Sequence, residues 1–223
     1  MAKFPKADED RVEDVCVWEG VALELARHCG IRVPLTCLVR VKDGAVLLLE
    51  RFDRRGVVGI PYPSGISAVQ GTVGGVFSYL ELVDFLEMEG AEPERDIREL
   101  WLCVLFSCAV GNTEDHMRNH GFLREGDGCS LSLAFDVNPT PGDGEKYLSY
   151  AIGFDDRLAH PVAALEACDY FRVDRNSARL TARRMARELS AWHRIAVGYG
   201  IAKTSIARMQ SCFKAGIERL QVL

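Results

Sequence analysis

A polar loop between apolar segments constrains this chain more than any other feature of its sequence. Residues 111–121 read Gly-Asn-Thr-Glu-Asp-His-Met-Arg-Asn-His-Gly, and a second acid, Asp136, follows 17 residues after Asn119. A hairpin between the two positions would bring an amide and a carboxylate together. These are hard oxygen ligands of the kind that Mg²⁺ prefers. The sequence therefore predicts a cation site formed by a loop and the far end of a hairpin.

The length and net charge of the chain limit its number of domains and the partners it can bind. The chain has 223 residues, enough for one large domain or two small lobes with a substantial core. Its net charge of −5 gives no reason to expect direct binding of nucleic acid. Several arginines recur between residues 172 and 187, and we interpret them as a solvated helix face.

Cysteine usage and hydropathy indicate a cytoplasmic protein. The eight cysteines form no C-x-x-C pair, and several lie in apolar runs, where cysteine behaves as a small buried group. No secretory signal and no membrane-spanning run are recognisable. We therefore expect reduced thiols, a cytoplasmic location and no association with membranes.

The pattern of apolar residues predicts an α+β protein. Strands are expected at residues 2–5, 33–41 and 45–50, with a short hairpin whose turn is 124–128 and whose second arm is 129–135. Helices are expected at residues 10–29, 79–89, 96–110, 161–171, 177–199 and 204–220. Residues 54–75 should be loop. The organisation is thus a strand-bearing part, residues 1–53, followed by a mostly helical part, residues 54–223, with a hinge near 50–55.

The acids and amides suit phosphoryl transfer, which depends on positioning and charge neutralisation. That chemistry requires an acid near the attacking hydroxyl, an Asn and an Asp on Mg²⁺, a lysine on the phosphates and an acid that orients this lysine. The candidates are Glu114 or Asp115, Asn119, Asp136, Lys3 and Glu19. Taken singly, Asn119 and Asp136 are equally typical of turns that end a strand.

The sequence also offers a candidate zinc site and a candidate phosphate-binding loop. His116 and His120 are four apart and would share one face of a helix, as zinc ligands do, but the glycines and Asn112 disfavour a helix there. We expect His116 to fix the loop by hydrogen bonds instead. The glycine cluster at 71–75 matches no phosphate-binding pattern and is expected to be a connector.

Three motifs resemble the C-terminal region of HipA-type toxins. They are Leu-Glu-Arg-Phe-Asp-Arg at 49–54, Asn-Thr-Glu-Asp-His-Met-Arg-Asn-His-Gly-Phe at 112–122 and Ala-Phe-Asp-Val-Asn-Pro-Thr at 134–140. Ala2-Lys3-Phe4 and the segment around Trp18-Glu19 also match. The matches occur in the family's order from the first residues to about Pro139, and the helical remainder fits the family's C-terminal bundle.

The resemblance implies a kinase-like bilobal fold and an ATP- and Mg²⁺-dependent serine/threonine protein kinase. Known members are toxins of bacterial toxin–antitoxin pairs that phosphorylate an aminoacyl-tRNA synthetase, halt translation and promote dormancy. A DNA-binding antitoxin of the HipB type binds them and represses their operon. Both proteins are expected partners of this chain by resemblance.

The family's cofactor-binding residues carry over to four positions. Lys3 would contact the phosphates, and Glu19 would be its partner on a helix. Glu50 and Phe52 would lie at the hinge that meets adenine. Family members carry a longer segment before the lysine, with a serine-bearing phosphate loop, so we expect a truncated gene, a mis-assigned start or a separately encoded N-terminal subunit.

The remaining carried-over residues lie in the polar loop and after the hairpin. Glu114 would occupy the catalytic acid position, with Asp115 as its possible substitute, and His116 would support the loop. Asn119 and Asp136 would bind Mg²⁺. Because the family has Asp where this chain has Glu114, a second hypothesis is a non-catalytic module that binds nucleotide or an antitoxin without transferring phosphate.

Overall fold

The computed structural model describes residues 1–4, 15–41, 44–72, 75, 77–154 and 156–223. Its N-terminal region contains the sheet β1-β3-β2, formed by β1 (Ala2–Lys3), β2 (Thr36–Val41) and β3 (Gly44–Leu49). Both pairings are antiparallel, and Leu47 lies opposite Leu38 on one side and Lys3 on the other. Strand β1 confirms the predicted strand at residues 2–3, whereas residue 4 lies outside it and residue 5 is not among the described residues. Strands β2 and β3 confirm the strands predicted at 33–41 and 45–50, although β2 begins only at Thr36, and β1 forms one edge of this sheet.

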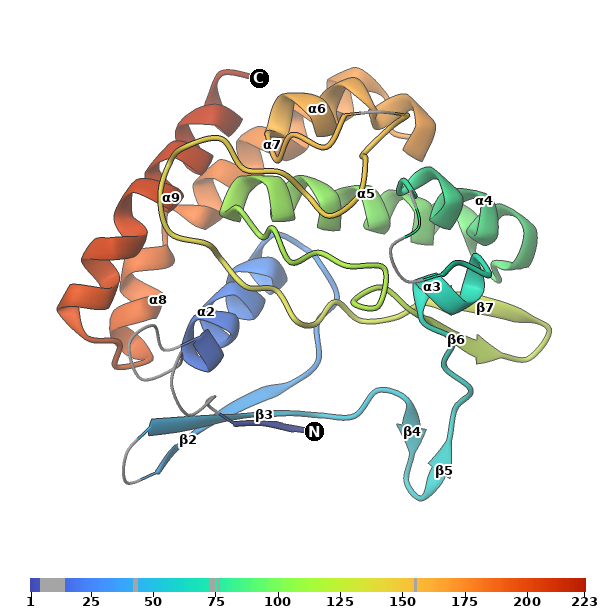
Figure 1. The fold of residues 1–223 in the computed structure, drawn as a ribbon, viewed down its shortest axis with the longest axis horizontal. Coiled ribbons are helices and arrows are strands. Elements are labelled where there is room, and N and C mark those ends of the chain that lie inside the picture. Colours follow the sequence, from blue (N-terminus) through green and yellow to red (C-terminus); the bar gives the residue numbers. More distant parts are fainter. Residues whose placement is uncertain (5–14, 42–43, 73–74, 76, 155) are drawn as a thin grey trace.

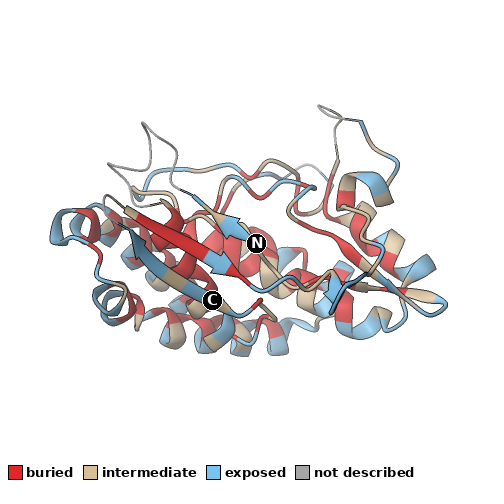
Figure 2. Ribbon diagram, turned by 90° about the horizontal axis from the view of Figure 1, so that it is seen from below, coloured by how far each residue is buried: buried red, intermediate tan, exposed pale blue. Residues whose placement is uncertain are grey.

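Helix α2 (Val15–His28) packs against this sheet, as Figure 1 shows. It lies within the predicted helix 10–29, whose first residues fall outside the described part of the chain. The helix is buried on nearly all sides, and Val21, Leu23 and Leu25 have no exposed surface. Strand β3 is likewise mostly buried, whereas β2 is largely exposed (Figure 2). A buried helix seldom carries an acid without a partner, so Glu19 in α2 marks a polar site.

The chain then enters the helical region. The predicted loop 54–75 holds the two-residue strands β4 (Arg54–Arg55) and β5 (Val58–Gly59) and the short helix α3 (Gly65–Ala68). Helices α4 (Leu80–Glu89) and α5 (Pro93–Val110) confirm the predicted helices at 79–89 and 96–110. Pro93 opens α5, and Gly111, at φ 64°, ends it in the left-handed conformation that glycine adopts without strain.

The polar loop leads into the second hairpin, β6 (Phe122–Glu125) and β7 (Gly128–Leu131). Its second arm is shorter than predicted, because β7 ends at Leu131 instead of reaching residue 135. Beyond it, the amide of Ala134 donates to the carbonyl of Arg32 at 2.8 Å, a residue of the connection between α2 and β2. The segment that carries Asp136 is thus bound to the N-terminal region and not to β6.

Helices form the C-terminal part, which wraps around α5 (Figure 1). They are α6 (Pro161–Glu166), the 3-10 helix η1 (Cys168–Phe171), α7 (Arg175–Leu189), α8 (Trp192–Gly198) and α9 (Lys203–Gln221). The single helix predicted over 177–199 is wrong, since it is broken between α7 and α8. Ser190 donates from its hydroxyl to the Ala186 carbonyl at 2.9 Å, a bond that bends helices. After the break, Trp192 stacks on Phe213 of α9 at 4.7 Å between ring centroids.

One hydrophobic core runs through both regions. Trp18 of α2 lies 6.0 Å from the Phe213 ring and donates from its indole nitrogen to the Ser205 hydroxyl at 3.0 Å. Through these contacts α2 packs against C-terminal helices as well as against its own sheet. The division of the chain into two parts at residue 53 stays a prediction. In the described ranges, no helix is sufficiently long and apolar to cross a bilayer.

Candidate nucleotide and metal site

The structure brings together three predicted site residues that are far apart in the sequence. Nζ of Lys3 lies 2.6 Å from Oε1 of Glu19 and 2.5 Å from Oδ1 of Asp136. The backbone amide of Asp136 also donates to Oε1 of Glu19, at 2.9 Å. One cation on β1, one acid on α2 and one acid after β7 therefore form a connected network.

Burial determines the electrostatics of this network. Glu19 is only 2% exposed, and burial raises the pKa of its carboxyl, which the charge of Lys3 only partly offsets. Burial alone would lower the pKa of Lys3, but the two neighbouring carboxylates outweigh it and raise the pKa. Lys3 therefore stays cationic at neutral pH.

Asp136 adopts a backbone conformation that is uncommon for a residue with a side chain. Its φ is 59°, in the left-handed region, and its side chain is 39% exposed. Such conformations persist where surrounding contacts hold them, and they concentrate at functional sites. Here the contact with Glu19 fixes the backbone of Asp136, while its carboxylate remains open to solvent.

A cleft of about 610 Å³ opens over the three residues. Lys3, Glu19 and Asp136 line it, together with Glu114 and His116 from the polar loop. The volume of the cleft is in the range of small-molecule sites, and side chains of both charges point into it. It therefore provides room for a phosphorylated ligand next to an acid on the loop.

Glu114 and Asp115 differ sharply in their surroundings. The side chain of Glu114 is 67% exposed, and its carboxylate lies 2.9 Å from Nε2 of His116. Asp115 is buried, and both of its carboxylate oxygens are occupied: Oδ1 by Nε2 of His120 at 2.8 Å, and Oδ2 by the Tyr79 hydroxyl at 2.7 Å. Of the two acids, only Glu114 lines the cleft.

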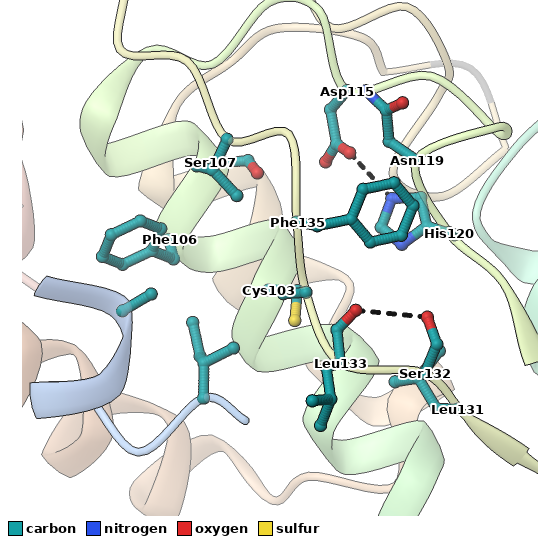
Figure 3. A pocket seen from close by; sticks show the side chains of 14 residues that line it. Cys103, Phe106, Ser107, Asp115, Asn119, His120, Leu131, Ser132, Leu133 and Phe135 are labelled. Carbon is teal, nitrogen blue, oxygen red and sulfur yellow. Dashed lines mark hydrogen bonds and ion pairs between the residues drawn. The ribbon is translucent and has the colours of Figure 1, made fainter. Parts of the chain in front are cut away.

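The contacts of Asp115 anchor the polar loop to the helical core. Figure 3 shows its carboxylate directed at His120, whose ring stands edge-on to Tyr79 with centroids 5.5 Å apart. Burial alone would raise the pKa of Asp115, but the electrostatic interaction with His120 and the hydrogen bonds to the carboxylate outweigh burial and lower the pKa. The sequence patterns did not indicate Tyr79, and they placed His120 only in an alternative zinc site. The signal was the apolar surroundings of the loop, in which a buried acid needs donors.

Asn119 lies within the loop but does not line the 610 Å³ cleft. Its Nδ2 donates to the Glu114 carbonyl at 2.8 Å, and its side chain borders a small pocket beside His120 and Phe135 (Figure 3). The oxygen Oδ1 is the atom of Asn119 that could bind a cation. Phe135 and Val137, the two neighbours of Asp136 in the sequence, line the same small pocket as Asn119, whereas Asp136 itself does not.

The side-chain oxygen of Asn138 is a possible cation ligand that the sequence patterns did not indicate. Its Oδ1 is buried without a hydrogen-bond partner among the described residues, while its Nδ2 lies 3.4 Å from Oδ1 of Asp136. Asn112, at the start of the loop, accepts a bond from the Asn138 amide at 3.2 Å. An orphaned amide oxygen beside an exposed carboxylate fits a hard cation such as Mg²⁺, which also keeps water and phosphate ligands.

Glu50 and Phe52, the predicted adenine-contacting residues, lie elsewhere. Neither lines the 610 Å³ cleft. The Phe52 ring packs against Phe135 at 5.7 Å and Tyr62 at 5.9 Å between centroids. The backbone amide of Glu50 donates to the Leu35 carbonyl at 2.9 Å. Their role at an adenine site therefore stays a prediction.

The two histidines of the loop do not share a helical face. Residues 111–121 form turns, and His116 is half-exposed beside Glu114, whereas His120 is buried against Asp115. Across the described ranges, no group of three or more His, Cys, Asp or Glu side chains could hold a metal ion. All eight cysteines are free thiols.

Residues 1–193 match the family described as the HipA-like C-terminal domain. The chain belongs to this family. The matched residues include the sheet, Lys3, Glu19 and Asp136, the polar loop and the helical region as far as the start of α8. No curated protein matches the chain.

Two solved structures show the same fold. The HipA toxin of Shewanella oneidensis MR-1, solved with HipB and its operator DNA, is 18% identical with a TM-score of 0.78; the match covers 99% of this chain and 57% of HipA. The proinflammatory kinase CtkA of Helicobacter pylori is 15% identical with a TM-score of 0.72, and the match covers all of this chain and 89% of CtkA. The α+β fold is therefore that of kinase-like HipA and CtkA, and the chain spans little more than half of the HipA chain.

Proposed function

We propose that this HipA-like chain is an ATP- and Mg²⁺-dependent serine/threonine protein kinase. The observation that carries the proposal is the network of Lys3, Glu19 and Asp136 in a cleft that also contains Glu114. A lysine held by a helix acid, next to an acid that can bind a metal, is the arrangement by which kinases position phosphates. Family membership and the kinase-like fold support the same activity.

Each residue has a role in this proposal. Lys3 would hold the phosphates, and Glu19 keeps it in place from α2. Asp136 and Asn119 would hold Mg²⁺, which when bound neutralises charge on the phosphates. Glu114 would accept the proton of the substrate hydroxyl, because it is exposed in the cleft, whereas Asp115 is buried with both oxygens occupied. His116, 2.9 Å from the Glu114 carboxylate, would orient it.

The adenine site and the biological partners belong to the same proposal. Glu50 and Phe52 would contact adenine at the connection that follows β3. The proposed role is that of a toxin, with an aminoacyl-tRNA synthetase as the candidate substrate and a HipB-like antitoxin as the candidate partner. The structure of the HipA relative in complex with HipB supports the antitoxin as the first partner to test.

One observation favours a second candidate, a module that binds nucleotide or antitoxin without transferring phosphate. Glu114 is one methylene longer than the Asp that the family has at this position, and its carboxylate is bonded to His116. A displacement near 1 Å at the reacting centre can reduce the rate by roughly 10²-fold.

Calorimetric titration of ATP with and without Mg²⁺ tests the metal and nucleotide site. We expect binding that depends on Mg²⁺, and we expect Asp136→Asn to abolish that dependence because it removes the ligating charge. Circular dichroism of the variant should be unchanged, since Asp136 is substantially exposed. An unaltered affinity in Asp136→Asn would contradict the metal assignment, and absence of any binding to the natural chain would contradict the nucleotide site.

A further inference from the structure

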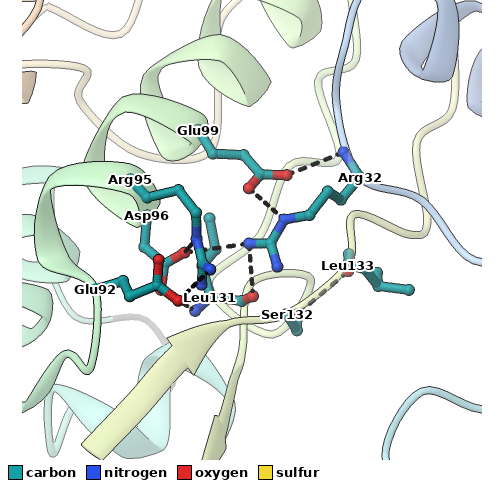
Figure 4. A network of polar contacts seen from close by, with 8 residues as sticks. All are labelled: Arg32, Glu92, Arg95, Asp96, Glu99, Leu131, Ser132 and Leu133. Carbon is teal, nitrogen blue, oxygen red and sulfur yellow. Dashed lines mark hydrogen bonds and ion pairs between the residues drawn. The ribbon is translucent and has the colours of Figure 1, made fainter.

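A polar network outside the cleft joins the N-terminal region to the segment that carries Asp136. Arg32 lies in the connection between α2 and β2, and its side chain reaches α5 and β7 (Figure 4). Its Nε lies 2.5 Å from Oε2 of Glu99, and its Nη2 donates to Oδ1 of Asp96 at 3.2 Å and to the Leu131 carbonyl at 3.1 Å. A planar guanidinium can satisfy several acceptors at once, which an ammonium cannot do with the same geometry.

The backbone of Arg32 takes part in the same network. Its amide donates to Oε1 of Glu99 at 2.9 Å, and its carbonyl accepts from the amide of Ala134 at 2.8 Å. The end of β7 and the segment that follows it are thus each bound to residue 32, by the Arg32 side chain at Leu131 and by the Arg32 carbonyl at Ala134. Ala134 precedes Asp136 by only two residues.

Asp96 makes the network difficult to rearrange. It has no exposed surface, and its Oδ2 accepts from the Leu131 amide at 2.8 Å while its Oδ1 also accepts from Nε of Arg95 at 2.9 Å. A buried carboxylate persists only where donors surround it. The position of Leu131, and hence the start of the segment, is therefore fixed by a fully buried acid.

Asp136 requires such support because its left-handed backbone is strained. Glu19 holds its amide from the cleft side, and the network around Arg32 holds the residues just before it. Both supports come from α2 or from the connection that directly follows it. One continuous segment, α2 and the connection after it, therefore holds the backbone of Asp136 and carries Glu19.

We propose that Arg32 is a positioning residue for Asp136, acting through residues 131–134 and not by contact with nucleotide or metal. Arg32 lines a separate cleft of about 520 Å³, which shares no residue with the 610 Å³ cleft. Its side chain is 38% exposed there, so it can be replaced without emptying the core. The proposal rests on the proposed function, since it assigns Asp136 to Mg²⁺.

The test compares Arg32→Ala and Arg32→Lys with Arg98→Ala. Arg98 lines the same 520 Å³ cleft on α5, but its ion pair is an exposed contact with Glu94 at 3.7 Å, away from the segment. ATP is titrated with and without Mg²⁺. Loss of Arg32 should weaken Mg²⁺-dependent binding by roughly 10- to 100-fold, as loss of a residue that orients a metal ligand does. Binding of ATP alone should change little, and Arg98→Ala should match the natural chain.

Hydrogen exchange of the amides of Ala134 and Asp136, without nucleotide, gives a second readout. Both Arg32 variants should exchange faster there than Arg98→Ala, and Arg32→Lys serves if Arg32→Ala does not fold. Unchanged exchange, or faster exchange with unchanged Mg²⁺-dependent affinity, overturns the positioning role. If the natural chain binds no Mg²⁺-nucleotide, the proposed function fails, and exchange alone then decides whether Arg32 holds Asp136 in place.

Discussion

Two adjacent acids in the polar loop have separate tasks because their surroundings differ. Glu114 extends into the cleft, whereas Asp115 ties the loop to Tyr79 and His120. The hydrogen bonds of Asp115 restrict the backbone on which Glu114 stands. Asp115 therefore fixes where the Glu114 backbone lies relative to the cleft. The loop cannot shift freely to compensate for the extra methylene of the Glu114 side chain.

Shortening Glu114 tests whether its length limits the reaction. We expect Glu114→Asp to raise the rate of phosphate transfer, by up to about 10²-fold, because the carboxylate returns to the family's position. The measurement is the initial rate of transfer of the ATP γ-phosphate to a generic serine-containing substrate. Glu114→Gln is the matched control and should abolish transfer. A slower Glu114→Asp enzyme would mean that the longer acid is adapted, and an active Glu114→Gln would remove Glu114 from the mechanism.

Because Asp115 is buried and hydrogen-bonded, we expect the stability of the protein to depend on pH. The folded pKa of Asp115 is lowered from the ordinary value of 3.8, so its contribution is fully present above that value and is lost as pH falls through the folded pKa. Asp115→Asn should reduce the free energy of unfolding at pH 7 by about 1–3 kcal/mol, because one buried donor loses its acceptor.

Urea denaturation at a series of pH values measures this effect. The difference between the natural chain and Asp115→Asn should be constant from pH 7 to about pH 5 and should shrink below about pH 4. Tyr79→Phe, which removes only the hydroxyl donor to Asp115, should leave the carboxylate intact and retain the acid sensitivity. A difference that does not vary with pH would show that Asp115 is not ionised in the folded protein.

The sequence predicted Lys3, Glu19 and Asp136 because each stands in a motif whose chemistry is local. It could not predict how Asp115 and Glu114 divide their tasks, since adjacent residues point to different sides of a loop and only the fold decides which side is buried. The same holds for Asn138, whose orphaned oxygen depends on packing. Arg32 stands in no motif, and its role follows from contacts with residues 64 or more positions away.

At the scale of elements, local patterns predicted helices well and their breaks poorly. Apolar periodicity continues from α7 into α8, so a single helix over 177–199 was the natural prediction. The break comes from Ser190, which bonds back to Ala186, and from the stacking of Trp192 on Phe213. Neither is visible as a glycine or proline signal, because tertiary packing decides it.

The crossing of α5 and α9 gives a prediction at this scale. Gly216 lies in α9 where a Cβ would overlap the carbonyl oxygen of Ala109 in α5. Alanine is the better helix former by about 1 kcal/mol, yet Gly216→Ala should destabilise the protein by about 1–3 kcal/mol through overpacking. Gly198, at the end of α8, has open space around it, so Gly198→Ala should be neutral or slightly stabilising.

Thermal unfolding of the two glycine variants tests whether the close approach of α5 and α9 requires glycine at position 216. The melting temperature of Gly216→Ala should fall, and that of Gly198→Ala should stay level or rise. Equal effects of the two substitutions would show that helix propensity, and not the close approach of α5 and α9, controls stability at these positions.

At the scale of the whole molecule, the core joins residues 1–53 to residues 54–223, the two parts that we predict from the sequence. Trp18 from α2 meets Trp192 and Phe213 at centroid distances of 6.3 and 6.0 Å and bonds to Ser205. The helix that carries Glu19 is therefore held by the C-terminal helices. Any motion that separates the two regions must break these contacts or carry α8 and α9 along.

We therefore expect the chain to unfold as one cooperative unit, with Trp18→Ala lowering the free energy of unfolding by about 3–5 kcal/mol. Two probes should give coincident transitions in urea: near-ultraviolet circular dichroism, which reports the aromatic cluster, and hydrogen exchange of β3, which reports the sheet. Val39→Ala is the matched control, because this residue of β2 is exposed and its truncation should change stability little. Separate transitions for the sheet and the aromatic cluster would instead show that residues 1–53 fold as a lobe of their own, and that the contacts of Trp18 are too weak to couple it to the helices.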